Sequence, residues 1–188
     1  EYDKKTENIR LVFETPKKEI YLLGNHADYV FRDRLIFLSL DIISAKGFYT
    51  DDRIIMTVNS SSNVKLEIPS TFIIYKFAGT QEKQKIEVAG IRRNLENSKI
   101  EYSINENNEK WIFTLKNPMK LSGGLVKLEN HDQLLAEAKD KLVNVKIEAK
   151  YKLRHPVAQG MEEALFFFLT PVIVPIGMVI WGWNSLTK

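Results

Sequence analysis

The residues best suited to bind a metal ion are one histidine and two aspartates that follow it closely. His26, Asp28 and Asp33 offer ring nitrogens and carboxylate oxygens within one short segment, and both atom types are common metal ligands. Their spacing fits no zinc pattern, and the chain has no H-E-x-x-H motif. A polar turn after Gly24 and Asn25 explains the same residues. We therefore predict that the protein has no metal site.

Motifs for calcium binding, phosphate binding and nucleophilic catalysis are incomplete. Asp51 and Asp52 lack the remaining ligands of a D-x-[DN]-x-[DN]-G calcium loop, and acidic pairs are common in turns. Gly123 and Gly124 lack the Lys-Ser/Thr of a phosphate loop and favour a turn with positive φ. The chain has no cysteine and no G-x-S-x-G sequence. We predict no catalytic residue, no cofactor and no enzymatic activity.

Basic residues near a tryptophan are a further candidate, for single-stranded nucleic acid or anionic lipid. The group consists of Arg92, Arg93, Lys116, Lys120 and Trp111. Adjacent arginines on a strand point to opposite faces, which favours a solvated rim over one binding surface. Lys and Arg number 27 and Asp and Glu 24, a surplus of only +3. Nucleic acid is therefore not an expected partner.

Alternation of apolar and polar residues runs through residues 1–155 and predicts about nine short strands. The longest candidate is Leu35–Ile43, in which both faces are largely apolar. Strands at spacings of about 8–15 residues favour an antiparallel β-sandwich or barrel-like sheet over βαβ units. The other candidates are Ile9–Phe13, Glu19–Leu23, Ile54–Val58, Val64–Ile68, Thr71–Phe77, Ile86–Val88, Ile100–Ile104 and Trp111–Leu115.

One helix and one last strand complete this predicted all-β domain. Asn130 or Asp132 can cap a short helix that runs to about Lys141. The cleanest alternation in the chain then predicts a strand from Val143 to Leu153.

The C-terminal segment from Ala164 to Trp183 carries no charged residue. A helix of that length covers roughly 30 Å, the thickness of a bilayer's hydrocarbon core. We predict a transmembrane helix at 164–183, joined to the β-domain by a linker at 156–163 and followed by a tail at 184–188; a buried helix of a globular domain is the alternative. The prolines predict a kinked helix that packs against partner helices. The expected anchor residues are Phe166, Phe167, Phe168, Pro171, Pro175, Gly177, Trp181 and Trp183.

These features together predict a non-catalytic, membrane-anchored β-domain that is a subunit or accessory factor of a membrane protein complex. The expected partners are the lipid bilayer and membrane proteins, contacted through the helix and through sheet edges. Two other functions stay open: a membrane-tethered domain that binds a lipid or glycan, and a membrane-tethered hydrolase whose carboxylates meet in space.

The expected location is that of a single-pass membrane protein. The chain begins with Glu1 rather than Met, which favours an exported domain on the periplasmic or extracellular side after removal of a signal peptide. The alternative is a cytoplasmic, tail-anchored protein, because Lys150, Lys152 and Arg154 precede the predicted helix.

Overall fold

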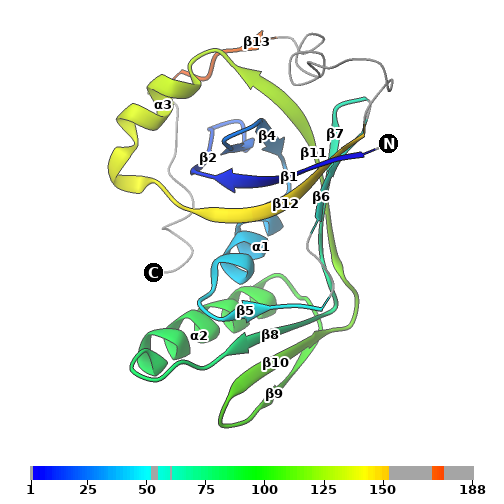
Figure 1. Cartoon of the computed structure of the whole chain (residues 1–188), viewed down its shortest axis with the longest axis vertical. Coiled ribbons are helices and arrows are strands. Elements are labelled where there is room, and N and C mark those ends of the chain that lie inside the picture. The colour runs from blue at the N-terminus through cyan, green and yellow to red at the C-terminus, as the bar shows by residue number, and fades with distance from the viewer. Residues whose placement is uncertain (1, 52–54, 60, 153–170, 176–188) are drawn as a thin grey trace.

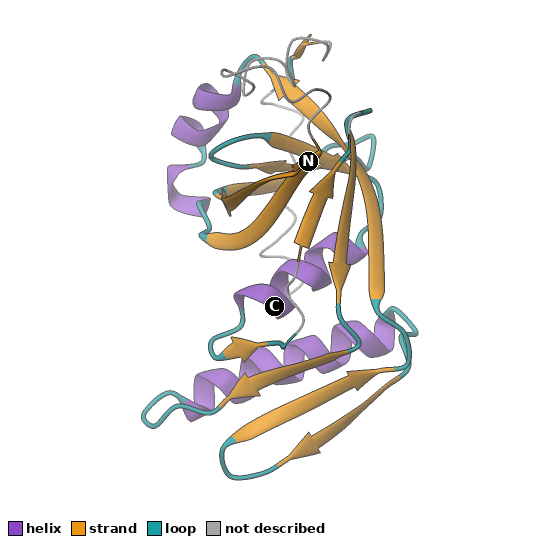
Figure 2. Ribbon diagram, turned by 45° about the vertical axis from the view of Figure 1, so that its right-hand side comes forward, coloured by secondary structure: helices purple, strands orange, loops and turns teal. Residues whose placement is uncertain are grey.

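The computed structural model of the chain describes residues 2–51, 55–59, 61–152 and 171–175 (Figures 1 and 2). These residues form a large nine-stranded sheet, a small four-stranded sheet and three α-helices. Helix α1 (Leu35–Ser44) lies between the two sheets, and helix α2 (Gln81–Asn97) lies along the small sheet (Figure 1). The fold is therefore mostly β, with helices in its core and on its surface.

The large sheet is antiparallel except at two places, where β12 pairs with β6 and β11 pairs with β13. Eight of its strands follow one another from edge to edge, and β13 pairs with β11 off this path. In spatial order the strands are β1 (Tyr2–Ile9), β12 (Val145–Lys152), β6 (Ile55–Val58), β7 (Asn63–Ile68), β11 (Met119–Leu128), β4 (Asp28–Phe31), β3 (Ile20–Leu23) and β2 (Leu11–Glu14), with β13 at Pro171–Val172.

The two ends of the large sheet are joined by the chain itself. Strands β1 and β2 are separated only by Arg10. The Arg10 N–H donates to the Leu23 carbonyl at 2.8 Å, and the Arg10 carbonyl accepts from the Val143 N–H at 2.8 Å. One continuous segment thus pairs first with β12 and then with β3. The sheet curls until its first and last strands meet (Figure 1).

The small sheet has one face against the core and one face turned outward. In spatial order its strands are β5 (Phe48–Tyr49), β8 (Thr71–Tyr75), β10 (Lys110–Leu115) and β9 (Tyr102–Glu106). Phe72 and Phe113 lie on the inner face and stack with ring centroids 4.8 Å apart. Gly47 begins this sheet with φ +89°, and a Cβ there would lie 2.3 Å from the Tyr75 carbonyl oxygen. Glycine is therefore required where α1 turns into β5.

The predicted strand Leu35–Ile43 is wrong, because this segment forms α1. Ile36, Phe37, Leu38, Leu40 and Ile42 are all at most 3% exposed. A helix that is apolar on every side belongs in a core, and here it fills the space between the sheets. The Asp33 carboxylate accepts the Leu35 N–H at 2.9 Å and so satisfies one donor at the start of the helix.

The predicted strand Ile86–Val88 is wrong as well, because both residues belong to α2. The buried side of this helix consists of Gln84, Val88, Ile91, Asn94 and Leu95, the spacing of a helical face. Ile86 is 71% exposed on another side. The expected short helix is present as α3 (His131–Glu137), followed by a 3₁₀ turn at Lys139–Lys141. An all-β domain with a single short helix is therefore not the fold.

Strand β11 is the longest strand among the described residues, and the glycine pair expected to form a turn lies inside it. Neither glycine has a positive φ. A Cβ on Gly123 would lie 2.5 Å from the Val30 carbonyl oxygen and 2.7 Å from the Phe31 ring. The close approach of β4 therefore explains this glycine.

The predicted transmembrane helix is not supported. Pro171–Val172, in the middle of the predicted span, form β13, which pairs in parallel with Lys127 and Leu128 of β11. No helix in the described part of the chain is long and apolar enough to cross a membrane. The expectation of a single-pass membrane protein is thus corrected. Of the expected anchor residues, Phe166, Phe167, Phe168, Gly177, Trp181 and Trp183 lie outside the described residues, and Pro175 is exposed.

The segment around β13 contributes to a second hydrophobic cluster. Val174 is 4% exposed and lies in this cluster with Leu11, Phe13, Leu23 and Leu134. The Asn130 amide holds the segment in place, donating to the Val174 carbonyl at 2.7 Å and accepting the Val174 N–H at 3.3 Å. The apolar character that predicted a membrane helix is used in protein packing at Val172 and Val174, whereas Ile173 between them is 63% exposed.

Candidate functional site

A buried carboxylate and two tyrosines form a polar network inside the large sheet. Glu7 of β1 and Tyr29 of β4 are 0% exposed, and Tyr151 of β12 is 5% exposed. Glu7 Oε2 accepts from the Tyr29 hydroxyl at 2.7 Å and from the Tyr151 hydroxyl at 2.9 Å. Glu7 Oε1 accepts the His26 N–H at 3.0 Å. The network therefore joins the neighbouring strands β1 and β12 to β4, which is not next to them in the strand order of the sheet.

The two tyrosines of this network are neutral donors at ordinary pH. Burial is the main cause that raises the pKa of both hydroxyl groups, and the charge of Glu7 raises it further. The hydroxyl oxygens also lie 2.6 Å from each other. Because each group is satisfied by another member, the network has the properties of a structural element rather than of a ligand site.

A histidine–aspartate pair lies at the surface end of the same region. His131 Nδ1 lies 2.8 Å from Asp28 Oδ1, and the His131 side chain is 27% exposed. The hydrogen bond to Asp28 is the main cause that raises the pKa of His131. Burial is the main cause that raises the pKa of Asp28, and the hydrogen bond from His131 opposes it. Protonated His131 thus offsets part of the cost of burying the Asp28 charge.

We expect the free energy of unfolding to fall as the pH rises from 6 to 8. A histidine whose pKa is raised by folding stabilises the fold below its ordinary pKa, and this stability is lost as the pH passes its folded pKa. The difference between a charged and a neutral hydrogen bond predicts a loss of about 1 kcal/mol. Urea unfolding at both pH values measures it. His131→Asn should remove the pH dependence, whereas His26→Asn, in which only a backbone contact is used, should keep it.

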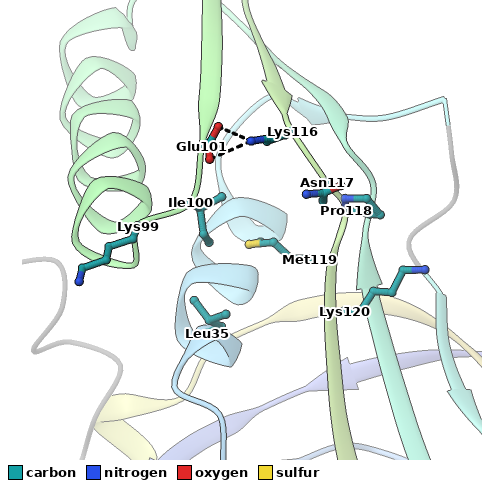
Figure 3. A pocket seen from close by; sticks show the side chains of 9 residues that line it. All are labelled: Leu35, Lys99, Ile100, Glu101, Lys116, Asn117, Pro118, Met119 and Lys120. Atoms are coloured by element: carbon teal, nitrogen blue, oxygen red, sulfur yellow. Dashed lines mark hydrogen bonds and ion pairs between the residues drawn. The ribbon is translucent and has the colours of Figure 1, made fainter.

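A surface pocket lies where three connections of the fold meet, at the junction between α1 and the two sheets (Figure 3). Its volume is about 310 Å³, the lower end of the range for small-molecule sites. We call it the basic pocket. It is lined by Leu35 at the start of α1, by Lys99, Ile100 and Glu101 between α2 and β9, by Lys116, Asn117 and Pro118 between β10 and β11, and by Met119 and Lys120 at the start of β11.

The floor of the basic pocket is apolar. The side chains of Leu35, Ile100 and Met119 converge at its centre (Figure 3). Ile100 is directed there by the end of α2, where Lys99 has φ +55° and the Ile100 N–H donates to the Leu95 carbonyl at 3.0 Å. Met119 is 5% exposed. This floor can accept a short aliphatic chain or a small ring.

The rim of the basic pocket is charged. Lys116 Nζ donates to both carboxylate oxygens of Glu101, at 3.0 and 2.8 Å. Lys99 and Lys120 lie on opposite sides and direct their ammonium groups outward (Figure 3). Among the lining residues, three lysines against one glutamate give a charge of +2. The Lys120 ammonium also lies 3.6 Å from the carboxylate of Glu67, which lies outside the lining and is itself half-exposed. Because these side chains are long, they can turn toward an anion at a modest cost in side-chain entropy.

The lining combines apolar, amine, carboxylate and amide groups. The nine lining residues include no hydroxyl, thiol or imidazole group. Its titratable pair, Lys116 and Glu101, is exposed, with side-chain exposures of 64% and 71%. The pocket can offer a ligand apolar contacts at its floor and ammonium groups at its rim.

The three residues that suggested a metal site each contact a different partner and do not form one site. The His26 N–H is bound to Glu7, Asp28 is bound to His131, and Asp33 accepts from the start of α1. No group of three potential ligands occurs among the residues that the structure describes. Asp51 accepts a hydrogen bond from the Tyr49 hydroxyl at 2.8 Å, and Asp52 lies outside the described residues.

The basic residues that the sequence singled out are only partly brought together. Lys116 and Lys120 line the basic pocket. Arg92 instead contacts Tyr102, and Trp111 is 3% exposed beneath the ammonium of Lys76, which lies 4.4 Å from the ring centroid. The apolar floor was missed, because nothing in the spacing of Leu35, Ile100 and Met119 predicts that they meet.

Comparison with known proteins found no family model that matches the chain, and no curated protein or solved structure with significant similarity to it. The functional proposal therefore depends on this chain's own geometry and chemistry.

Proposed function

We propose that the protein is a non-catalytic binding protein whose ligand is a small amphiphilic anion, held in the basic pocket. The observation that carries the proposal is the combination of an apolar floor with a rim of charge +2 in one cavity. An acyl chain or aromatic ring would lie against Leu35, Ile100 and Met119. Its carboxylate or phosphate would meet Lys116, with Lys99 and Lys120 within reach of rotation.

The affinity expected for such a ligand follows from the number of its atoms that the cavity can hold. About ten non-hydrogen atoms at roughly 0.5 kcal/mol each give about 5 kcal/mol, a Kd on the order of 0.1 mM. Such a value suits a ligand that exchanges rapidly.

Three small-molecule probes separate the contribution of the ligand's alkyl chain from that of its negative charge. We expect octanoate to bind saturably, and acetate and octylammonium to bind at least tenfold more weakly, because each lacks one of the two features. The readout is the methyl NMR signal of Met119. Met56, which is 0% exposed in β6, gives an internal control whose signal should not move. Equal binding of octylammonium and octanoate, or an unmoved Met119 signal, would refute the proposal.

A single charge change tests the role of Lys116. Glu101→Gln should strengthen octanoate binding about three- to tenfold, because it removes the carboxylate that competes for this ammonium. Glu82→Gln is the matched control: Glu82 forms a similar exposed pair with Lys85 at 2.8 Å, away from the pocket, and should leave the Kd unchanged. A Kd that does not respond to Glu101→Gln would place the anion elsewhere.

A further inference from the structure

One face of the large sheet carries lysines that the pairing of its strands brings together. Strands β1, β12, β6, β7 and β11 lie side by side (Figure 1). In β7 and β12 the apolar residues are buried, and the residues between them are exposed or half-buried on the outer side of the sheet. We call this outer side the lysine face. Its six lysines are Lys4, Lys65, Lys120, Lys146, Lys150 and Lys152.

The register of the strands places three of these lysines in one row. Lys4 of β1 lies opposite Lys150 of β12. Lys150 lies next to Thr57 of β6, which lies next to Lys65 of β7. With strands about 4.8 Å apart, the row is about 14 Å long, and residues 146–152 cover about 20 Å along β12. Like charges directly opposite each other are destabilising, so the stability of the fold does not explain the pair of Lys4 and Lys150.

The lysine face has few opposing charges. Within the described part of the chain, only one of its six lysines forms an ion pair: Lys120, whose ammonium lies 3.6 Å from Glu67. The other carboxylate on this face belongs to Glu148, which is half-buried. Six lysines against two glutamates give the face a charge of +4, whereas the whole chain has +3. All other residues therefore sum to −1, and the small surplus that argued against nucleic acid is concentrated on one face.

The other side chains of the lysine face are suited to phosphate groups. Thr6, Thr57 and Ser122 place hydroxyl groups among the charged residues, and hydroxyl and ammonium groups are common donors to the phosphates of nucleic acids. None of the large apolar side chains that are exposed in the described residues lies on this face. Single strands are held by aromatic rings that stack on their bases, and membrane surfaces by apolar side chains that enter them. The face therefore matches the phosphate backbone of a duplex better than either.

We propose that the lysine face binds double-stranded DNA through its phosphate groups, without reading its sequence. The length of residues 146–152, about 20 Å, corresponds to about six base pairs at about 3.4 Å each. The row from Lys4 to Lys65 is about as long as the major groove is wide, about 12 Å, so lysines at its two ends can contact phosphates of both strands. The face shares only Lys120 with the basic pocket, so this inference does not depend on the ligand proposed for the pocket.

The first measurement is the binding of the full chain to a fluorescein-labelled DNA duplex of about 20 base pairs. Fluorescence anisotropy should show saturable binding, with a Kd on the order of 10 μM in about 50 mM salt. Raising the salt concentration to about 200 mM should weaken binding about 40- to 150-fold, the effect of releasing counterions from three or four phosphates. A duplex that does not bind in the lower salt, or whose affinity falls less than about tenfold, would overturn the proposal.

Two double variants locate the binding surface. Lys4→Gln with Lys150→Gln should weaken duplex binding in the lower salt by about tenfold or more and should reduce the salt dependence by about two phosphate contacts. Lys83→Gln with Lys139→Gln removes the same charge at exposed positions of α2 and of the 3₁₀ turn, and should change the Kd less than about twofold. Equal losses in the two double variants would show that only the net charge matters, and the proposal would be wrong.

Loss of binding is separated from loss of the fold by stability. Because Lys4 and Lys150 repel each other, their replacement should not lower the free energy of unfolding, which urea unfolding measures. Lys65→Gln with Lys146→Gln, on two strands of the same face, should weaken duplex binding as well. The octanoate affinity should be unchanged in both, since none of these four residues lines the basic pocket. Wild-type duplex affinity in either stable variant would contradict the assigned surface.

Two other anions test the class of partner. A labelled single strand of about twenty thymidines should bind about threefold more weakly than the duplex or less, because its phosphates are less dense. Vesicles of phosphatidylcholine with about 30% phosphatidylserine should not displace the duplex at an equal concentration of accessible charge. Tighter binding of the single strand, or displacement of the duplex by the vesicles, would assign the lysine face to a different partner and refute the proposal.

Discussion

Glu7→Leu should lower the free energy of unfolding by about 3–5 kcal/mol, one of the two largest effects we expect from any single change. The substitution removes the acceptor shared by the hydroxyls of Tyr29 and Tyr151 and leaves the His26 N–H without its partner. Breaking a buried polar network by deleting one partner costs this much, because the remaining groups stay desolvated. Urea unfolding followed by circular dichroism measures the loss.

Two further variants test this explanation. Glu7→Gln should cost only about 1–2 kcal/mol, because an amide can accept from His26 and donate to the tyrosines. The triple variant Glu7→Leu, Tyr29→Phe, Tyr151→Phe should be more stable than Glu7→Leu alone, since it removes the unpaired hydroxyls. Tyr21→Phe, which deletes a hydroxyl bound to Glu19 at 3.2 Å, is the control and should cost less than about 1 kcal/mol. Additive losses in the triple variant would contradict a coupled network.

The second large effect is expected at Phe113, where Phe113→Ala should cost about 3–5 kcal/mol. Phe113 is 0% exposed, stacks on Phe72 with an interplanar angle of 9°, and lies 6.2 Å from the Tyr102 ring. Truncation removes a buried aromatic ring and leaves a cavity between the small sheet and the helices. Thermal and urea unfolding should both show the change.

Ile112→Ala is the matched comparison, because Ile112 precedes Phe113 on β10 and lies half-buried on the outer face. It should cost about 1 kcal/mol. The main cluster includes residues of both sheets, so Phe113→Ala should also lower the stability of the large sheet in one cooperative transition. If unfolding occurred in two separate transitions and Phe113→Ala shifted only the first, the two sheets would unfold independently.

Most strands could be predicted from the sequence, including β3, all of whose residues are buried, whereas the helix buried in the core could not. Strand β12 shows regular alternation, and the structure places its apolar positions inside, down to Tyr151. Segment Leu35–Ser44 has no polar face, so its periodicity cannot distinguish a strand from a core helix. The membrane prediction fails at 171–175 for the same reason, since the sequence does not say what covers an apolar run.

The site was less predictable than the fold. Two of its lysines, Lys116 and Lys120, could be singled out because they are basic and close in sequence. The floor comes from α1, from the end of α2 and from the start of β11, and no spacing rule connects such distant segments. The buried Glu7 gave no signal either, because β1 is polar along most of its length.

The closure of the large sheet at Arg10 affects how the protein is made. Strand β1 pairs only with β12, from Tyr2 opposite Lys152 to Ile9 opposite Val145. At about 5–20 residues per second, a ribosome completes β12 on the order of ten seconds after β1. During that time β1 has no strand to pair with. Its sequence, with Asp3, Lys4, Lys5 and Glu7 among eight residues, keeps a waiting strand soluble. The charges of β1 thus protect the nascent protein until β12 has been synthesised.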